Sequence, residues 1–203
     1  MYIRVSGVMS TLRRPSLAPL RPLRYIHGMD DPRYPIGRFS YDKEPTPEKR
    51  AGWIRDLADA PRLLRAATAG LTPAQLDTPY RDGGWTARQV VHHVADSHMN
   101  SFIRMKLALT EDVPTIKPYD QDAWVTLADV KGMDIGLSLS LLDGLHARMV
   151  ALLSSLSAAD FGRTFMHPEN GPTTLDRNLQ IYAWHGNHHA AHITSLRDRK
   201  RWM

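Results

Sequence analysis

The sequence predicts an all-α protein, a four-helix bundle with short extra helical turns in the connections. Four long segments combine helix-start signals with apolar periodicity. No segment alternates with period two for long enough to suggest a sheet. The chain has 203 residues, enough for one sizeable core and too few for two. We therefore expect residues 30–203 to form one helical domain.

The first half of this domain contains two of the long helices. Thr46-Pro47 predicts a helix start, and the apolar stripe that follows ends near Gly70. Thr72–Gln75 repeats the signal for one short helical turn. Thr86–Gln89 fits a capping box and predicts a second long helix that ends near Leu109.

The second half contains the other two. A leucine-rich third helix is expected over about Ile135–Leu156, after a proline-containing connection. Ser157–Asp160 predicts another short turn. A loop with Pro168, Gly171 and Pro172 follows, and the last helix should run from Thr173 or Thr174 to about Arg199.

The positive charge of the chain is concentrated in residues 1–29. This segment contains five arginines and no lysine, aspartate or glutamate, so the net charge of +5 belongs to it and the remaining residues are neutral overall. We expect residues 1–29 to form a disordered basic leader. Its prolines disfavour an amphipathic transit helix, and an early start codon, with Met29 as the true first residue, explains it better. A neutral body argues against a nucleic-acid partner.

Composition excludes several other classes. The chain has no cysteine, which excludes disulfides, thiolate catalysis and cysteine-type zinc sites. Any metal ion must therefore bind histidine or carboxylate side chains. No apolar run reaches the roughly 18–20 residues that span a bilayer, so we expect a cytoplasmic protein without a membrane partner.

Histidine is clustered in two of the predicted helices. Seven of the ten histidines lie in Val90–Asn100 or Trp184–Ile193. On a helix the four in the second segment share an arc of about 100°. Two pairs, His185/His189 and His188/His192, have the i,i+4 spacing that lets two imidazoles reach one ion. Spacing alone does not choose between them.

The third ligand should come from the second long helix. His92 and His93 point about 100° apart, so only one can face a given site. A polar strip accompanies His93 and includes Asp96 and Asn100, whereas His98 falls on the opposite, apolar face. Metal binding would explain a polar strip on a packed helix. A solvated face, a pH-sensitive contact or simply buried histidines would also account for the pattern.

Three stretches resemble the YfiT group of the DinB-like superfamily over about residues 31–203. They are YPIGRF (34–39), LDTPYRDGGWTARQVVHHVADSHMNSFIRMKLALTE (76–111) and YAWHGNHHAAHI (182–193). The resemblance implies a four-helix bundle, usually a homodimer, with one divalent nickel or zinc ion. The family's ligands are one histidine in an HxAD element and an HxxxH pair on the last helix. Matched to this chain, they are His93, His185 and His189.

The resemblance also implies three classes of function. Members of the group are described as candidate metal-dependent hydrolases, which act on small-molecule substrates. Relatives in the wider superfamily transfer low-molecular-weight thiols such as bacillithiol, mycothiol or glutathione. A non-catalytic metal-binding stress-response protein is the third class. If the site is catalytic, Asp96, Asn100 and His192 are the neighbouring groups that would position substrate or move protons.

Overall fold

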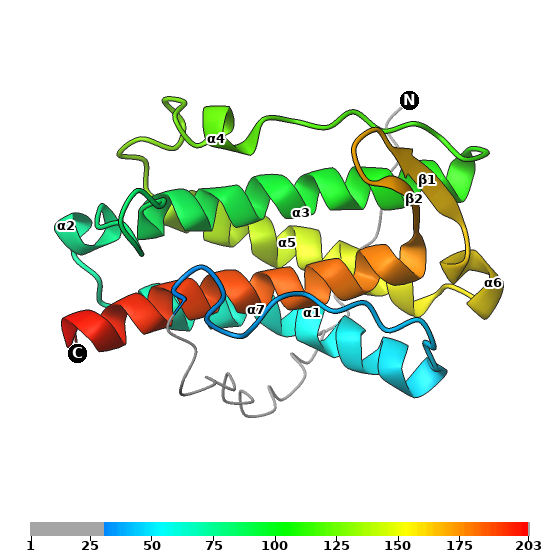
Figure 1. The fold of residues 1–203 in the computed structure, drawn as a ribbon, viewed down its shortest axis with the longest axis horizontal. Helices are drawn as coiled ribbons and strands as arrows, with labels where there is room; N and C mark the ends of the chain where they lie inside the picture. The colour runs from blue at the N-terminus through cyan, green and yellow to red at the C-terminus, as the bar shows by residue number, and fades with distance from the viewer. Residues whose placement is uncertain (1–30, 203) are drawn as a thin grey trace, which may run out of the picture.

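Four long helices dominate the computed structural model, which describes residues 31–202. They are α1 (Pro47–Thr68), α3 (Ala87–Thr110), α5 (Ile135–Ser154) and α7 (Leu175–Lys200). The expectation for residues 1–29 lies outside the described residues. The predicted four-helix bundle is confirmed (Figure 1).

Side-chain caps start each long helix where the sequence predicts a start. Thr46, Thr86 and Thr174 each accept a hydrogen bond from the backbone N–H three residues later, and Asp134 caps α5 through Gly136. These bonds satisfy N–H groups that have no partner within the helix. The four helix boundaries are therefore set locally.

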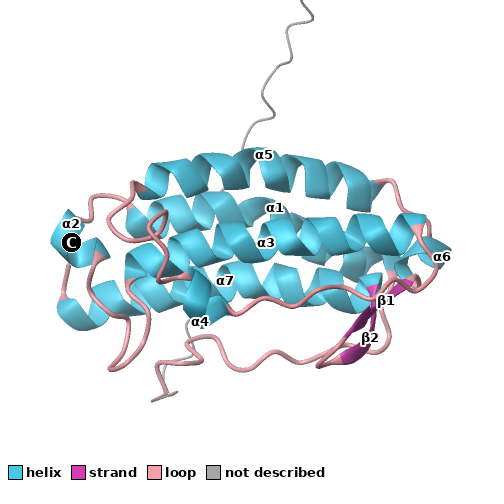
Figure 2. Ribbon diagram, turned by 90° about the horizontal axis from the view of Figure 1, so that it is seen from above, coloured by secondary structure: helices cyan, strands magenta, loops and turns pink. Residues whose placement is uncertain are grey.

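The helices form a four-sided bundle in which α1 packs against α5 and α7, and α3 packs against the same two helices. Consecutive long helices α1 and α3 thus lie across a diagonal. Figure 2 shows α5 along one edge of the bundle. Segment 31–45 runs beside α7, where Gln180 bonds to the backbone of Asp42 at both its amide oxygen and its amide nitrogen.

Short elements fill the connections. Two predicted helical turns are present, α2 (Pro73–Leu76) and α6 (Ala158–Phe161), together with α4 (Gln121–Trp124). An antiparallel hairpin of β1 (Thr164–His167) and β2 (Gly171–Thr174) corrects the expectation of a chain without strands. Each strand has four residues, too few to show a period-two pattern.

The core has two apolar clusters, one toward each end of the bundle. Buried histidines lie among their side chains: His93, His98, His146, His189 and His192 are each at most 7% exposed. A bidentate ion pair between Arg50 and Asp176, with both bonds 2.7 Å long, joins α1 to the start of α7. Besides this ion pair, the interior of the bundle therefore contains the five histidine side chains named above.

Helix α5 has an apolar outer face. Among the described residues it is the one helix long and apolar enough to cross a membrane, although the core helix of a globular protein meets the same criteria. Only 33% of its most apolar window is buried. The helix contains Asp143 and Arg148, so it is not the uninterrupted apolar run that the sequence was expected to lack. Leu137 and Leu141 are 59% and 46% exposed on this face.

Candidate metal centre

Three imidazole rings from two helices converge between α3 and α7. Nε2 of His185 lies 3.3 Å from Nε2 of His93 and 3.2 Å from Nε2 of His189. The ligand nitrogens of the three residues all lie within 4.8 Å of one another. Nitrogens that bind a tetrahedral ion at about 2.0–2.1 Å lie about 3.3 Å apart. Two of the three nitrogen–nitrogen distances therefore match the distance expected between two ligands of such an ion.

The helical repeat and one close helix approach produce this convergence. His185 and His189 are four residues apart and therefore share one face of α7. Between them stands Gly186, where a Cβ would lie 2.6 Å from Cβ of Ala60 on α1. The missing side chain lets α7 pack tightly on α1, which explains a glycine that otherwise weakens a helix centre.

Burial keeps the three imidazoles neutral. Loss of solvent, with a smaller contribution from the nearby His192, lowers the pKa of His93 to about 4. The same desolvation, followed by repulsion between neighbouring imidazoles, holds the pKa values of His185 and His189 well below the ordinary range. Neutral imidazoles offer lone pairs, which is the form that binds a metal ion.

The donor set fits a divalent ion. Three neutral nitrogens without a thiolate or carboxylate suit zinc, nickel and similar first-row metals. Three protein ligands also leave one position of a tetrahedral ion open, as in catalytic zinc sites. Where the lone pairs of these nitrogens face one another, a bound cation would offset their mutual repulsion. The geometry and the chemistry therefore both favour a metal site.

The second ring nitrogens of the two α7 histidines bond to further histidines. Nδ1 of His185 lies 3.1 Å from Nε2 of His98, and Nδ1 of His189 lies 3.3 Å from Nδ1 of His192. His98 was not among the site residues that the sequence pattern indicated. The position of His98 on the apolar face of a packed helix could have indicated it, because a histidine there needs a buried polar partner.

Asp96 and Asn100, the acidic and amide candidates, are joined to each other within α3. Asn100 donates from Nδ2 to the carbonyl oxygen of Asp96, one turn earlier on the same helix. Burial, with a smaller contribution from the Asp129 carboxylate, raises the pKa of Asp96 to about 6. No hydrogen bond or ring contact within residues 31–202 joins Asp96 or Asn100 to the three convergent imidazoles.

The alternative HxxxH pair has a different environment. The His188 ring stacks on Trp184, with 4.1 Å between the ring centroids, and its Nδ1 has no hydrogen-bond partner among the described residues. His192 bonds to His189 instead of joining the convergent group. Of the two pairs that the spacing allowed, His185/His189 is the one that the fold brings to His93.

Two aromatic residues border the histidines. The Trp85 ring lies 4.6 Å from the His93 ring and 6.5 Å from the His189 ring, measured between centroids. Its Nε1 donates to Asp122 in α4, which links this side of the site to the connection after α3. Tyr80 stacks on His192 at 4.1 Å. Neither aromatic residue was among the site residues that the sequence pattern indicated.

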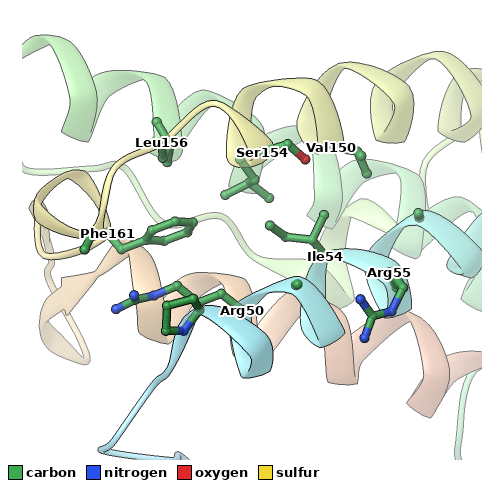
Figure 3. Close-up of a pocket in the computed structure, with 12 residues that line it drawn as sticks. Arg50, Ile54, Arg55, Val150, Ser154, Leu156 and Phe161 are labelled. Atoms are coloured by element: carbon green, nitrogen blue, oxygen red, sulfur yellow. The ribbon is translucent and has the colours of Figure 1, made fainter.

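A groove lies on the opposite side of the bundle, between α1 and α5. Its volume is about 540 Å³, and residues such as Ile54, Val150 and Phe161 line it (Figure 3). None of the convergent histidines contributes to this lining. The groove is therefore separate from the candidate metal centre.

The bundle and its three-histidine cluster define a metal-binding helical protein. The chain belongs to the DinB superfamily, whose model matches residues 56–193. A relative from Bacillus cereus strain B4264, named as a candidate metal-dependent hydrolase, is 56% identical over 174 residues. That alignment covers 86% of this chain and 100% of the relative. A Bacillus thuringiensis subsp. konkukian relative with the same description is 55% identical over 174 residues. That alignment also covers 86% of this chain and 100% of the relative.

A solved structure is also similar. YfiT from Bacillus subtilis, described as "a probable metal-dependent hydrolase with an unusual four-helix bundle topology", is 50% identical in sequence. The TM-score is 0.83, and the match covers 85% of this chain and 99% of YfiT. The expected resemblance to the YfiT group is confirmed.

Proposed function

We propose that this protein is a metal-dependent hydrolase of small molecules, with one divalent zinc or nickel ion held by His93, His185 and His189. The convergence of their Nε2 atoms is the observation that carries the proposal. The names of the Bacillus relatives support the reaction class. An ion with three neutral imidazole ligands supplies Lewis acidity and activates water near neutral pH.

The surrounding residues suit such chemistry. His93 and the α7 pair hold their lone pairs in a buried setting, where electrostatic interactions are stronger than in water. The Trp85 ring lies against the His93 ring on one side, with 4.6 Å between the centroids. A carboxyl group with a pKa of about 6, as at Asp96, exchanges protons readily near neutral pH. We assign to Asp96 the transfer of protons with substrate, and to Asn100 a supporting contact on the same helix.

The metal assignment is tested by two adjacent substitutions. Wild-type protein and His188→Gln should each retain about one divalent ion per chain, because His188 is outside the convergent group. His189→Gln should lose it, as measured by elemental analysis after extensive dialysis. Full metal content in a His185→Ala/His189→Ala double variant would show that the ligands lie elsewhere.

The reaction class is tested by one screen. Metal-loaded and chelated protein are compared on small esters, amides and alkyl electrophiles, with and without a low-molecular-weight thiol. Metal-dependent turnover without thiol supports a hydrolase, whereas an absolute requirement for thiol would replace it with a thiol transferase. Turnover no greater than that of the free ion would leave a metal-binding protein without catalysis.

We also propose that the protein is a homodimer that pairs through α5. Leu137 and Leu141 are exposed one turn apart, and Gly144, Ala147 and Ala151 continue the same exposed face beside Arg148, whose guanidinium lies over the Phe102 ring of α3. An apolar helix face of this kind is typical of a contact between copies of a chain. Small residues would allow two such helices to approach closely.

A further inference from the structure

His192 connects one candidate ligand to the backbone of a loop. Its Nδ1 lies 3.3 Å from Nδ1 of His189, and its Nε2 lies 3.1 Å from the carbonyl oxygen of Arg33. The residue is 2% exposed, and its ring stacks on Tyr80 at a centroid distance of 4.1 Å. Both ring nitrogens are therefore engaged within the protein, and neither faces an open position.

The carbonyl oxygen determines which nitrogen of His192 carries the proton. A carbonyl only accepts hydrogen bonds, so Nε2 of His192 must be the donor to Arg33. His192 is 2% exposed, and its hydrogen bonds and ring contacts among the described residues include no carboxylate, so the imidazole is neutral and has a single N–H. Its Nδ1 is then an acceptor.

The same logic extends to His189. Because Nδ1 of His192 accepts, Nδ1 of His189 must donate across the 3.3 Å contact. The proton of His189 is thus on Nδ1, and the lone pair is on Nε2, which faces Nε2 of His185 at 3.2 Å. The opposite tautomer would set two lone pairs against each other at the His192 contact and aim an N–H into the metal site.

We propose that the Arg33 carbonyl, acting through His192, fixes the tautomer of His189 that binds the metal ion. His192 is then a positioning residue, which orients a ligand and does not exchange protons with substrate. The proposal rests on the metal site of the proposed function. It also gives segment 31–45 a task, because this loop lies beside α7 (Figure 1) and brings the Arg33 carbonyl within bonding distance of that helix.

Two substitutions at position 192 separate the two bonds. In His192→Asn the amide oxygen takes the place of Nδ1 and can still accept from His189, but the bond to Arg33 is lost. In His192→Gln the amide group takes the place of Nε2 and can still donate to Arg33, but no acceptor faces His189. Zinc affinity, measured by chelator competition, should fall about 10- to 100-fold in His192→Gln and stay within about threefold of wild type in His192→Asn.

A role in packing alone predicts the reverse order, because glutamine fills more of the space than asparagine does. Equal losses in the two variants, or a larger loss in His192→Asn, would overturn the proposal. His92 supplies the control: it is buried on α3 and bonded to Ser138 on α5, away from the convergent rings. His92→Gln and His92→Asn should leave zinc affinity unchanged.

A measurement on wild-type protein keeps the proposal testable if the variants fail to fold. Long-range ¹⁵N–¹H NMR spectra report which ring nitrogen is protonated. With zinc bound and after chelation, His192 should be protonated on Nε2 and His189 on Nδ1. A proton on Nδ1 of His192 would overturn the proposal. Wild-type protein that binds no zinc would instead refute the metal site itself, and unchanged affinity in His192→Gln would refute only the relay.

Discussion

The buried histidines should make the metal-free protein sensitive to mild acid. Folding lowers the pKa of His93 and His192 to about 4 and that of His188 to about 3, from an ordinary value of 6.5. As the pH falls, the unfolded chain therefore binds protons before the folded chain does. The stability that these residues contribute is complete above about pH 6.5 and is lost as the pH approaches 4.

The size of the effect follows from the same shifts. Between about pH 7.5 and pH 5, each of the three imidazoles should lower the free energy of unfolding by about 2 kcal/mol. Asp96 has the opposite effect because folding raises its pKa to about 6. Its protonation in the folded chain should raise the free energy of unfolding by about 1 kcal/mol as the pH falls over the same range. The net loss from these four groups is about 5 kcal/mol, which is comparable to the total stability of many domains. The other buried histidines with lowered pKa values add to this loss.

Urea unfolding of chelator-treated protein, followed by far-ultraviolet circular dichroism at several pH values, measures this loss. His188→Gln should reduce the difference between pH 7.5 and pH 5 by about 2 kcal/mol, whatever it does to stability at neutral pH. Bound metal should stabilise the neutral ligands and move the acid transition to lower pH. A free energy of unfolding that changes by less than about 1 kcal/mol over this range would refute the inference that the histidines are buried and neutral.

Two further predictions concern helix packing. Gly186→Ala should lower the free energy of unfolding by about 1–3 kcal/mol in thermal or urea unfolding, because the new Cβ would collide with Ala60. Gly52→Ala on α1, where a Cβ would meet only the flexible guanidinium group of Arg55 at 3.8 Å, should instead raise it by about 0.5–1 kcal/mol, and a stabilising Gly186→Ala would contradict the close approach. Leu137→Lys/Leu141→Lys should convert the proposed dimer to monomers in light scattering without loss of metal, whereas an unchanged mass would place the dimer contact elsewhere.

The sequence was sufficient to predict the long helices because their signals are local. A capping hydroxyl at Thr46 or Thr86 acts on a backbone N–H only three residues away. The hairpin at 164–174 could not be predicted in the same way. Its four-residue strands depend on a turn with Gly171 at φ +71° and on a long-range bond from the Ile116 N–H to the Met166 carbonyl.

The candidate site, too, could be predicted from the sequence only in part. The i,i+4 spacing placed His185 and His189 on one face, and the family resemblance singled out His93 as their partner. The roles of Asp96 and Asn100 stay predictions, because the hydrogen bond between them lies within α3 and reaches none of the three imidazoles.

By itself, the sequence determined where the helices begin, which side chains share a helix face, and that a metal ion here would bind histidine or carboxylate groups instead of cysteine. Only the tertiary structure decided which nitrogens meet, because ring orientation depends on partners far away in the chain. The bond from His192 to Arg33 spans 159 positions, and the bond from His98 to His185 spans 87. The helical repeat fixes the direction of a side chain around the axis of its own helix. A coordination site also requires the relative positions of several helices and loops, which only packing supplies.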